Sequence, residues 1–306
     1  MIDRSFLISG PAKITVGGTV LYTQGDIEVA PAKNLRDINS SLHGPLDKSV
    51  LGASVAINFT PMSVWAAAWR TVLFPAAFLA PAFMGARLFG NADQAVVIDS
   101  VDGQSYTFHN ARLTQMPEIF CGISEELFGG ATITALRKNN SVMGDADSLM
   151  TIGASAWDGT DFPTPFDQSK TTAAFGAVSG MTAMNALNGW RVQHEIDLGP
   201  VEWDGETIDF KVRNYRAIAR GIAVQPTAAQ ILSALAVQGV AAGSRLSATA
   251  NDLAITGTNF AVTLKKANVT DAGFVFGVDP LRNGEIAFAT TLGFTAGAAD
   301  PRLVLA

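Results

Sequence analysis

Hydrophobic and polar residues alternate along two windows of equal length, residues 107–136 and 263–292, and the two windows resemble each other. Period-two alternation is typical of half-buried β-strands, so both windows predict strands. Matching positions carry the same residue type at Ala111 and Ala267, Thr114 and Thr270, and Phe120 and Phe276. Related tetrapeptides precede them, GARL at 85–88 and GSRL at 243–246. A repeat of this length predicts an internal duplication that builds two similar domains.

Each half also begins with a predicted β-hairpin. Residues 14–22 place two β-rich runs around Gly17 and Gly18, and residues 201–210 turn at Asp204 and Gly205. Glycine and aspartate at such positions favour tight two-residue turns. Between the first hairpin and a predicted strand at 54–60 lies segment 30–50, which is polar and interrupted by proline and glycine. We expect it to be a long functional loop.

One helix is predicted in each half. Pro61 suits the first turn of a helix over 62–74, where Trp65, Trp69, Val72 and Leu73 fall on one stripe. The second helix is expected to begin near Thr227 and to end at Gly239. Further strands are expected at 95–99, 105–108, 254–256, 260–265, 273–277 and 285–291. The pattern as a whole predicts a mainly-β fold of antiparallel sheets with one flanking helix in each unit.

Length and composition agree with two domains. The 306 residues are about twice the length of a typical domain. We expect a first domain over 1–137, an Asn-, Ser- and Gly-rich connector over 138–172, and a second domain over 173–306. The connector is predicted to be a linker or an ordered surface excursion, and the C-terminal tail from 293 is predicted to be frayed or docked on a neighbour.

Charge and cysteine usage exclude several functional classes. Charged residues make up only 16% of the chain, so we expect apolar surface to be buried between subunits. A net charge of −6 argues against a protein that grips nucleic acid, because an acidic surface repels DNA. The single cysteine, Cys121, indicates a fold without an intramolecular disulfide, and no secretory signal is evident. The apolar run at 71–86 is too short and too proline-rich for a membrane span.

Catalytic and metal-binding motifs are not evident. His43, His109 and His194 are isolated from one another, and no HExxH, GxSxG, Walker or GxGxxG pattern occurs. The acidic pairs at 145–147 and 158–161 lack the glycine and glutamate of a calcium loop, and the pair at 125–126 has no acidic counterpart in the second half. We therefore expect neither enzymatic activity nor a cofactor nor a bound metal.

A family resemblance follows from the order of these blocks. The chain carries GPAKITVGGTVLYTQGDIEV at 10–29, a polar segment, a strand ending at 60–61, a helix, and GVDPLRNGEIAFATT at 277–291. This order resembles the major tail tube proteins of long-tailed, siphovirus-like bacteriophages. The most specific parts of the resemblance are the N-terminal block and the turn at 282–285.

The resemblance implies a β-sandwich or half-barrel with a flanking helix, whose strand edges pair with neighbours around a ring. Stacked rings would form the tail tube, a virion component assembled in the host cytoplasm, through which DNA passes without specific binding. With two such domains per chain, we expect a trimeric ring with pseudo-sixfold symmetry, a hexamer being the alternative. Expected partners are further copies of the chain and other tail proteins, with no membrane.

Two sets of residues follow from this hypothesis. The segment 30–50 is expected to contact the next ring through Arg36, Asp37, His43, Asp47 and Lys48. Asp209 is expected to face the channel. The alternative from another class is a duplicated β-sandwich that binds carbohydrate or a host surface, for which Trp157, Phe162 and Phe166 in the connector would supply an aromatic platform.

Overall fold

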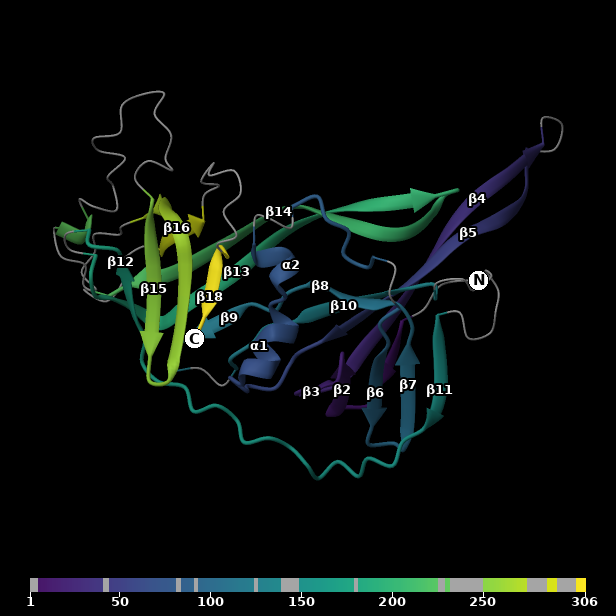
Figure 1. Cartoon of the computed structure of the whole chain (residues 1–306), viewed down its shortest axis with the longest axis horizontal. Helices are drawn as coiled ribbons and strands as arrows, with labels where there is room; N and C mark the ends of the chain where they lie inside the picture. The colour runs from purple at the N-terminus through teal and green to yellow at the C-terminus, as the bar shows by residue number, and fades with distance from the viewer. Residues whose placement is uncertain are drawn as a thin grey trace.

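The computed structural model describes residues 5–40, 44–80, 84–90, 93–123, 126–138, 149–178, 181–224, 229–231, 250–273, 285–290 and 301–306. Its strands form three antiparallel sheets, and its two named helices are short (Figure 1). The predicted mainly-β fold is therefore confirmed. The earlier predictions for His43, for most of the second helix, and for the turn at 282–284 lie outside the described residues.

The first part of the chain forms two sheets of five strands. The first sheet has the order β1 (Phe6–Ile8), β4 (Ile27–Ser40), β5 (Gly44–Phe59), β10 (Ala131–Leu136) and β8 (Ala111–Gln115). The second has the order β11 (Met150–Ala154), β7 (Gln104–Phe108), β6 (Val96–Ser100), β2 (Ala12–Val16) and β3 (Thr19–Tyr22). Their buried positions alternate along β2, β6 and β8, as expected for strands with one face on a core.

The later part of the chain forms one larger sheet. Its order is β12 (Thr172–Phe175), β15 (Asn251–Gly257), β16 (Phe260–Ala272), β17 (Glu285–Thr290), β14 (Glu206–Ala223), β13 (Met184–Trp203) and β9 (Ile119–Cys121). The strand β18 (Leu303–Leu305) pairs with β16. Because β12 also pairs with β13, the sheet closes on itself into a small barrel. The strand β9 comes from the earlier part of the chain and joins the two regions.

The two regions pair their strands in the same order. In one region β8, β10, β5 and β4 are neighbours, and in the other β16, β17, β14 and β13 are neighbours. A register shift skips Thr114 in β8 and Thr270 in β16. Each of these threonine hydroxyls donates to a carbonyl of the facing strand at 3.3 Å. The backbone also has a positive φ at Asn110 and Lys266, 41° and 49°.

The two predicted hairpin turns are confirmed. Gly17 and Gly18 have φ values of 55° and 84° between β2 and β3, and Asp204 and Gly205 have 51° and 84° between β13 and β14. Two successive positive φ values are the requirement of a type I′ turn, which matches the twist of paired strands. The second hairpin is much longer than predicted, with strands of 20 and 18 residues.

The prediction of a loop over 30–50 is wrong. Apart from 41–43, which are not described, this segment belongs to the long antiparallel hairpin of β4 and β5, which projects from the body of the molecule (Figure 1). Residues 32–39 are all exposed, so neither face of β4 needs apolar residues there and the alternation that marks a strand is missing. Pro31 pairs with Val55 beyond the residues that β1 pairs, so the other edge of β4 is open there and proline is tolerated.

The first helix begins later than predicted. The helix α1 spans Ala67–Leu73, and Pro61 instead forms a β-bridge with Thr23. The backbone amide of Met62 donates to the Tyr22 carbonyl at 2.8 Å, which holds the segment before α1 in an extended form. With α2 (Ala76–Leu79), α1 lies between the two regions in Figure 1. Among the described residues, no helix has the length and apolar character that a bilayer crossing requires.

The connector and the C-terminus both dock on the body of the same chain. In the described part of the connector, β11 pairs with β7, and the amide of Phe166 donates to the Ser63 carbonyl at 2.6 Å. This part is therefore an ordered surface excursion rather than a linker. The last strand, β18, pairs with β16, and the Ala306 carbonyl accepts the Trp65 indole N–H at 2.9 Å. The expected frayed or neighbour-docked tail is thus wrong for residues 301–306.

Candidate assembly interface

Two long ribbons distinguish this molecule from a simple sandwich. We call residues 35–40 and 44–50 of β4 and β5 the free ribbon, and residues 198–212 of β13 and β14 the docked ribbon. The pair at the base is Asn34 with Gly52 for the free ribbon and Asp197 with Asn214 for the docked ribbon. A register shift comes directly after this pair in both. Four pairs later a second shift occurs, and two more pairs reach the tip. The two ribbons therefore have matching lengths and matching bulges.

The tip of the docked ribbon packs on the base of the free ribbon. The side-chain amide of Asn34 donates to the Gly205 carbonyl, and Gly205 lies against Leu51. Arg137 holds the Glu206 carboxylate through two hydrogen bonds of 2.8 and 3.0 Å. Such a two-point contact between guanidinium and carboxylate fixes direction as well as position.

Gly52 makes room for this contact. A Cβ added at Gly52 would lie 2.9 Å from the Glu206 Cγ, closer than carbon atoms approach in proteins. The absence of a side chain therefore lets the docked ribbon approach the backbone of β5 closely.

Asp209 anchors the middle of the docked ribbon. Its Oδ1 accepts the backbone amide of Phe89 at 2.8 Å, and its Oδ2 accepts that of Gly90 at 3.1 Å. The neighbouring segment also pairs with β14 through the Gly85 amide and the Val212 carbonyl at 2.7 Å. Asp209 is 1% exposed, so the prediction that it faces a channel is wrong. A buried carboxylate requires such donors, and the GARLFG segment at 85–90 supplies them.

The foot of the same hairpin is also held by the first region. The strand β9 pairs with β13 from Trp190 to Val192. Glu118, just before β9, accepts hydrogen bonds from Arg191 and, at 3.0 Å, from Gln193. Foot, middle and tip are thus all in contact with the first region of the chain.

The free ribbon lacks comparable contacts with the described part of the chain. Of the predicted contact residues, Arg36, Asp37, Asp47 and Lys48 are exposed here, and Lys48 lies 3.4 Å from Asp37 in a surface ion pair. A pair this exposed adds little stability. Large apolar side chains are exposed beside them at Leu35, Ile38, Leu46 and Val50, at 44%, 45%, 59% and 49%. An apolar group rimmed by charges is typical of a protein interface.

Catalytic constellations are not found among the described residues, and no group of three or more metal-binding side chains occurs there. Cys121 is 1% exposed, and burial raises the pKa of its thiol, which keeps it protonated and unreactive. Burial lowers the pKa of His194 to about 3, so the ring is neutral at physiological pH. Its Nδ1 lies 2.9 Å from the Tyr215 hydroxyl and is not near a nucleophile.

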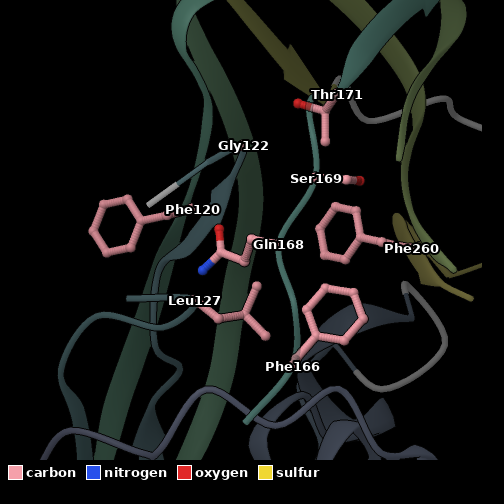
Figure 2. A pocket seen from close by; sticks show the side chains of 8 residues that line it. All are labelled: Phe120, Gly122, Leu127, Phe166, Gln168, Ser169, Thr171 and Phe260. Atoms are coloured by element: carbon pink, nitrogen blue, oxygen red, sulfur yellow. The ribbon is translucent and has the colours of Figure 1, made fainter. Parts of the chain in front are cut away.

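One small interior pocket lies where the two regions and the connector meet (Figure 2). Its volume is about 10 Å³, enough for the centre of one water molecule and too small for a substrate. Phe166 and Phe260 stand on one side of it and the Gln168 amide points into it (Figure 2). Both polar atoms of that amide are buried without a hydrogen-bond partner among the described residues. The pocket is a packing defect between elements rather than a ligand site.

The connector aromatics pack against aromatic residues of the first region, with Trp157 and Phe166 partly buried and Phe162 37% exposed. The Trp157 and Phe162 rings lie 6.0 and 5.5 Å from the Tyr22 ring, and the Phe166 ring lies 6.5 Å from that of Trp65. The side chains are used to dock the connector. This arrangement disfavours the carbohydrate-binding alternative.

No protein-family model matches the chain, and no curated protein is significantly similar to it in sequence. Function is therefore inferred from the geometry of the two ribbons.

The contact of Arg36, Asp37, Asp47 and Lys48 with the next ring stays a prediction, and the sequence gives no sign of the residues that hold the docked ribbon. Asn34, Gly52 and Arg137 carry no motif, and their role depends on contacts with residues about seventy to one hundred and seventy positions away in the chain. One available signal was the aspartate that both ribbons carry just inside the second register shift, Asp47 and Asp209.

Proposed function

We propose that this protein is a structural component of a bacteriophage tail tube, in which copies assemble into rings and the rings stack into a conduit for DNA. The observation that carries the proposal is the pair of matching ribbons, one docked within the chain and one exposed. A chain built in this way has one satisfied interface and one unsatisfied interface of the same kind. It is therefore suited to head-to-tail association.

The proposal includes an internal duplication. The matching strand order, the bulges at Thr114 and Thr270, and the shared register shifts of the ribbons support it. Bulges are specific features that redirect a strand, and their recurrence at corresponding places favours two copies of one unit. Each copy would be a tail-tube-like unit with a long hairpin.

Ring closure follows from repeating the internal contact. A head-to-tail interface generates a ring where its rotation closes and an open filament where it does not. Three chains would contribute six units related by pseudo-sixfold symmetry. The exposed edges of the long hairpins would then pair with neighbours, which removes the aggregation hazard that they present in a lone subunit.

The charge of the chain suits a conduit. With a net charge of −6, the assembled wall would repel the DNA backbone and would not hold a passing genome.

Electron microscopy of the purified protein tests the proposal. We expect rings or tubes with a stain-filled central bore, and a ring mass of three chains by native mass spectrometry. Compact monomers at high protein concentration, without rings or tubes, would contradict the proposal. A ring of six chains would retain the tube and overturn the pseudo-sixfold arrangement.

A further inference from the structure

We infer that the free ribbon of one copy docks on the second region of a neighbouring copy, at the place corresponding to the site where the docked ribbon binds within the chain. The partner is a second copy of this protein. The inference rests on the proposed function and assigns the residues of its ring contact: the ribbon tip next to Gly44 as the donor surface, and Asp197, Arg213 and Asn214 as the receiving surface.

The receiving surface is defined by the register of the strands. Asn34, Leu51 and Gly52 receive the tip of the docked ribbon. The pair Asp197–Asn214 occupies the position of Asn34–Gly52, and Arg213 is skipped by the register shift as Leu51 is. These three residues are exposed in the isolated chain.

An open cavity marks the same place. It has a volume of about 440 Å³, and Glu195, Asp197, Asn214 and Arg216 are among its lining residues. At the corresponding place in the first region, the tip of the docked ribbon is present and forms its contacts. The cavity is therefore located where a second ribbon tip would bind.

Side chains of the free ribbon are exposed at positions where the docked ribbon is buried. Val50 is 49% exposed, whereas Val212, which occupies the same position, is 1% exposed. Asp47 is exposed, whereas Asp209 is 1% exposed and bound to two backbone amides of the first region. Burying the exposed apolar side chains of the free ribbon against a neighbouring copy would stabilise the contact.

Residue sizes at the two interfaces are complementary. Inside the chain, the large Glu206 at the tip meets Gly52, which has no side chain. At the proposed interface, Gly44 occupies the position of Glu206, and Asn214 occupies that of Gly52. A small residue faces a larger one in both cases. Inside the chain the larger residue is at the ribbon tip, and at the proposed interface it is on the receiving surface.

The proposed contact is confined to the distal part of the free ribbon. At the foot of β4, residues Ile27 to Val29 are already paired with β1, in the place that β9 takes on β13. A neighbouring copy therefore needs to engage only the residues beyond Asn34.

Disulfide trapping tests this inference. We would prepare Gly44→Cys and Asn214→Cys as separate variants, with Asp197→Cys as a second receiving position, and oxidise them alone and in mixtures. The native Cys121 is 1% exposed and contributes little background. The matched intrachain control is the double variant Gly52→Cys/Glu206→Cys, because a Cβ at Gly52 would lie 3.2 Å from the Glu206 Cβ, near disulfide geometry.

We expect a cross-linked dimer from mixtures of Gly44→Cys with Asn214→Cys or Asp197→Cys, and at least tenfold less from each variant alone. The double variant Gly44→Cys/Asn214→Cys should give a ladder that ends at three chains. Rings or tubes by microscopy without these cross-links would overturn the inference and leave the proposed function intact. Cross-linking of Gly44→Cys with itself would also overturn it, since that contact is isologous. Absence of rings from the wild-type protein would instead contradict the proposed function.

Discussion

The free and docked ribbons have matching bulges and matching lengths, and they differ in what surrounds them. Val212 of the docked ribbon is 1% exposed and Val50 of the free ribbon is 49% exposed, although each occupies the same position in its hairpin. The docked ribbon is held at its middle and tip by the first region of the chain, which also holds the foot of the same hairpin. Ribbon conformation is therefore set within each hairpin, whereas ribbon burial depends on a neighbouring unit.

Removing a whole ribbon tests this difference with the largest effect. We would replace residues 37–48 by Asn-Gly, which leaves Arg36 and Ser49 paired beside a two-residue turn. The shortened protein should unfold within about 2 °C of the unassembled wild type, because changes at exposed positions alter stability little, and it should form no tubes. The matched replacement of 200–210, next to the pair Gly199 and Lys211, removes Asp209 and the docked tip and should prevent folding. Circular dichroism and microscopy measure both outcomes, and normal tubes from the first variant would contradict the account.

A single charge at matched positions gives the next largest effect. Val212→Asp places an unpaired carboxylate in a buried site and should lower the free energy of unfolding by about 4 kcal/mol. Val50→Asp should change it by less than about 0.5 kcal/mol, because the site is exposed in the isolated chain, but it should abolish tube formation. Urea denaturation and sedimentation distinguish the two effects. Equal destabilisation by the two substitutions would remove the distinction between the ribbons.

The two matched aspartates provide a milder test. Asp209→Ala leaves the buried amide of Phe89 and the partly buried amide of Gly90 without their acceptor and should cost about 2–3 kcal/mol of unfolding free energy. Asp47→Ala should leave the monomer unchanged and raise the protein concentration required for assembly. Light scattering against concentration measures the second effect, and an unchanged threshold would show that Asp47 is not used in the ring contact.

The last effect concerns acid and is absent at neutral pH. His194 lies on β13 in the position that Pro31 has on β4, and burial lowers its pKa to about 3. In the unfolded chain, His194 takes up a proton near pH 6.5. The unfolding free energy of the protein therefore falls as the pH drops below 6.5, and His194 has no effect on it at higher pH. Relative to His194→Gln, the unfolding free energy of the wild type should fall by about 1.4 kcal/mol for each pH unit between pH 6 and pH 4. If the unfolding free energies of the two proteins fell equally over this range, the imidazole of His194 would not be held neutral in the folded protein.

Several elements of the fold were predictable because they obey local rules. The turns at Gly17–Gly18 and Asp204–Gly205 need positive φ values, and glycine and aspartate at these positions predict such turns. Strands with one buried face, such as β6 and β16, show the alternation of their environment. The bulges at Thr114 and Thr270 coincide with a threonine shared by the two sequence windows, although the windows alone do not reveal a bulge.

The free ribbon and the full length of the docked ribbon could not be predicted because their stability does not come from alternation. Residues 32–39 are exposed on both faces and read as a polar loop, although they form a regular antiparallel pair. The helix predicted over 62–74 begins too early. The hydrogen bond from the Met62 amide to the Tyr22 carbonyl holds this segment extended, against its local helical preference. Asp209 illustrates the same limit at the candidate interface, because its acceptor role depends on amides 119 and 120 positions away.

A density map of the assembled particle, at a resolution that traces the strands, tests the central claim most directly. The account predicts a hollow ring in which each free ribbon reaches the adjoining chain, with Gly44 beside Asn214 and with the same relation that places Glu206 beside Gly52 inside each chain. A ring whose free ribbons point away from the neighbouring second region, or a particle without a bore, would contradict it.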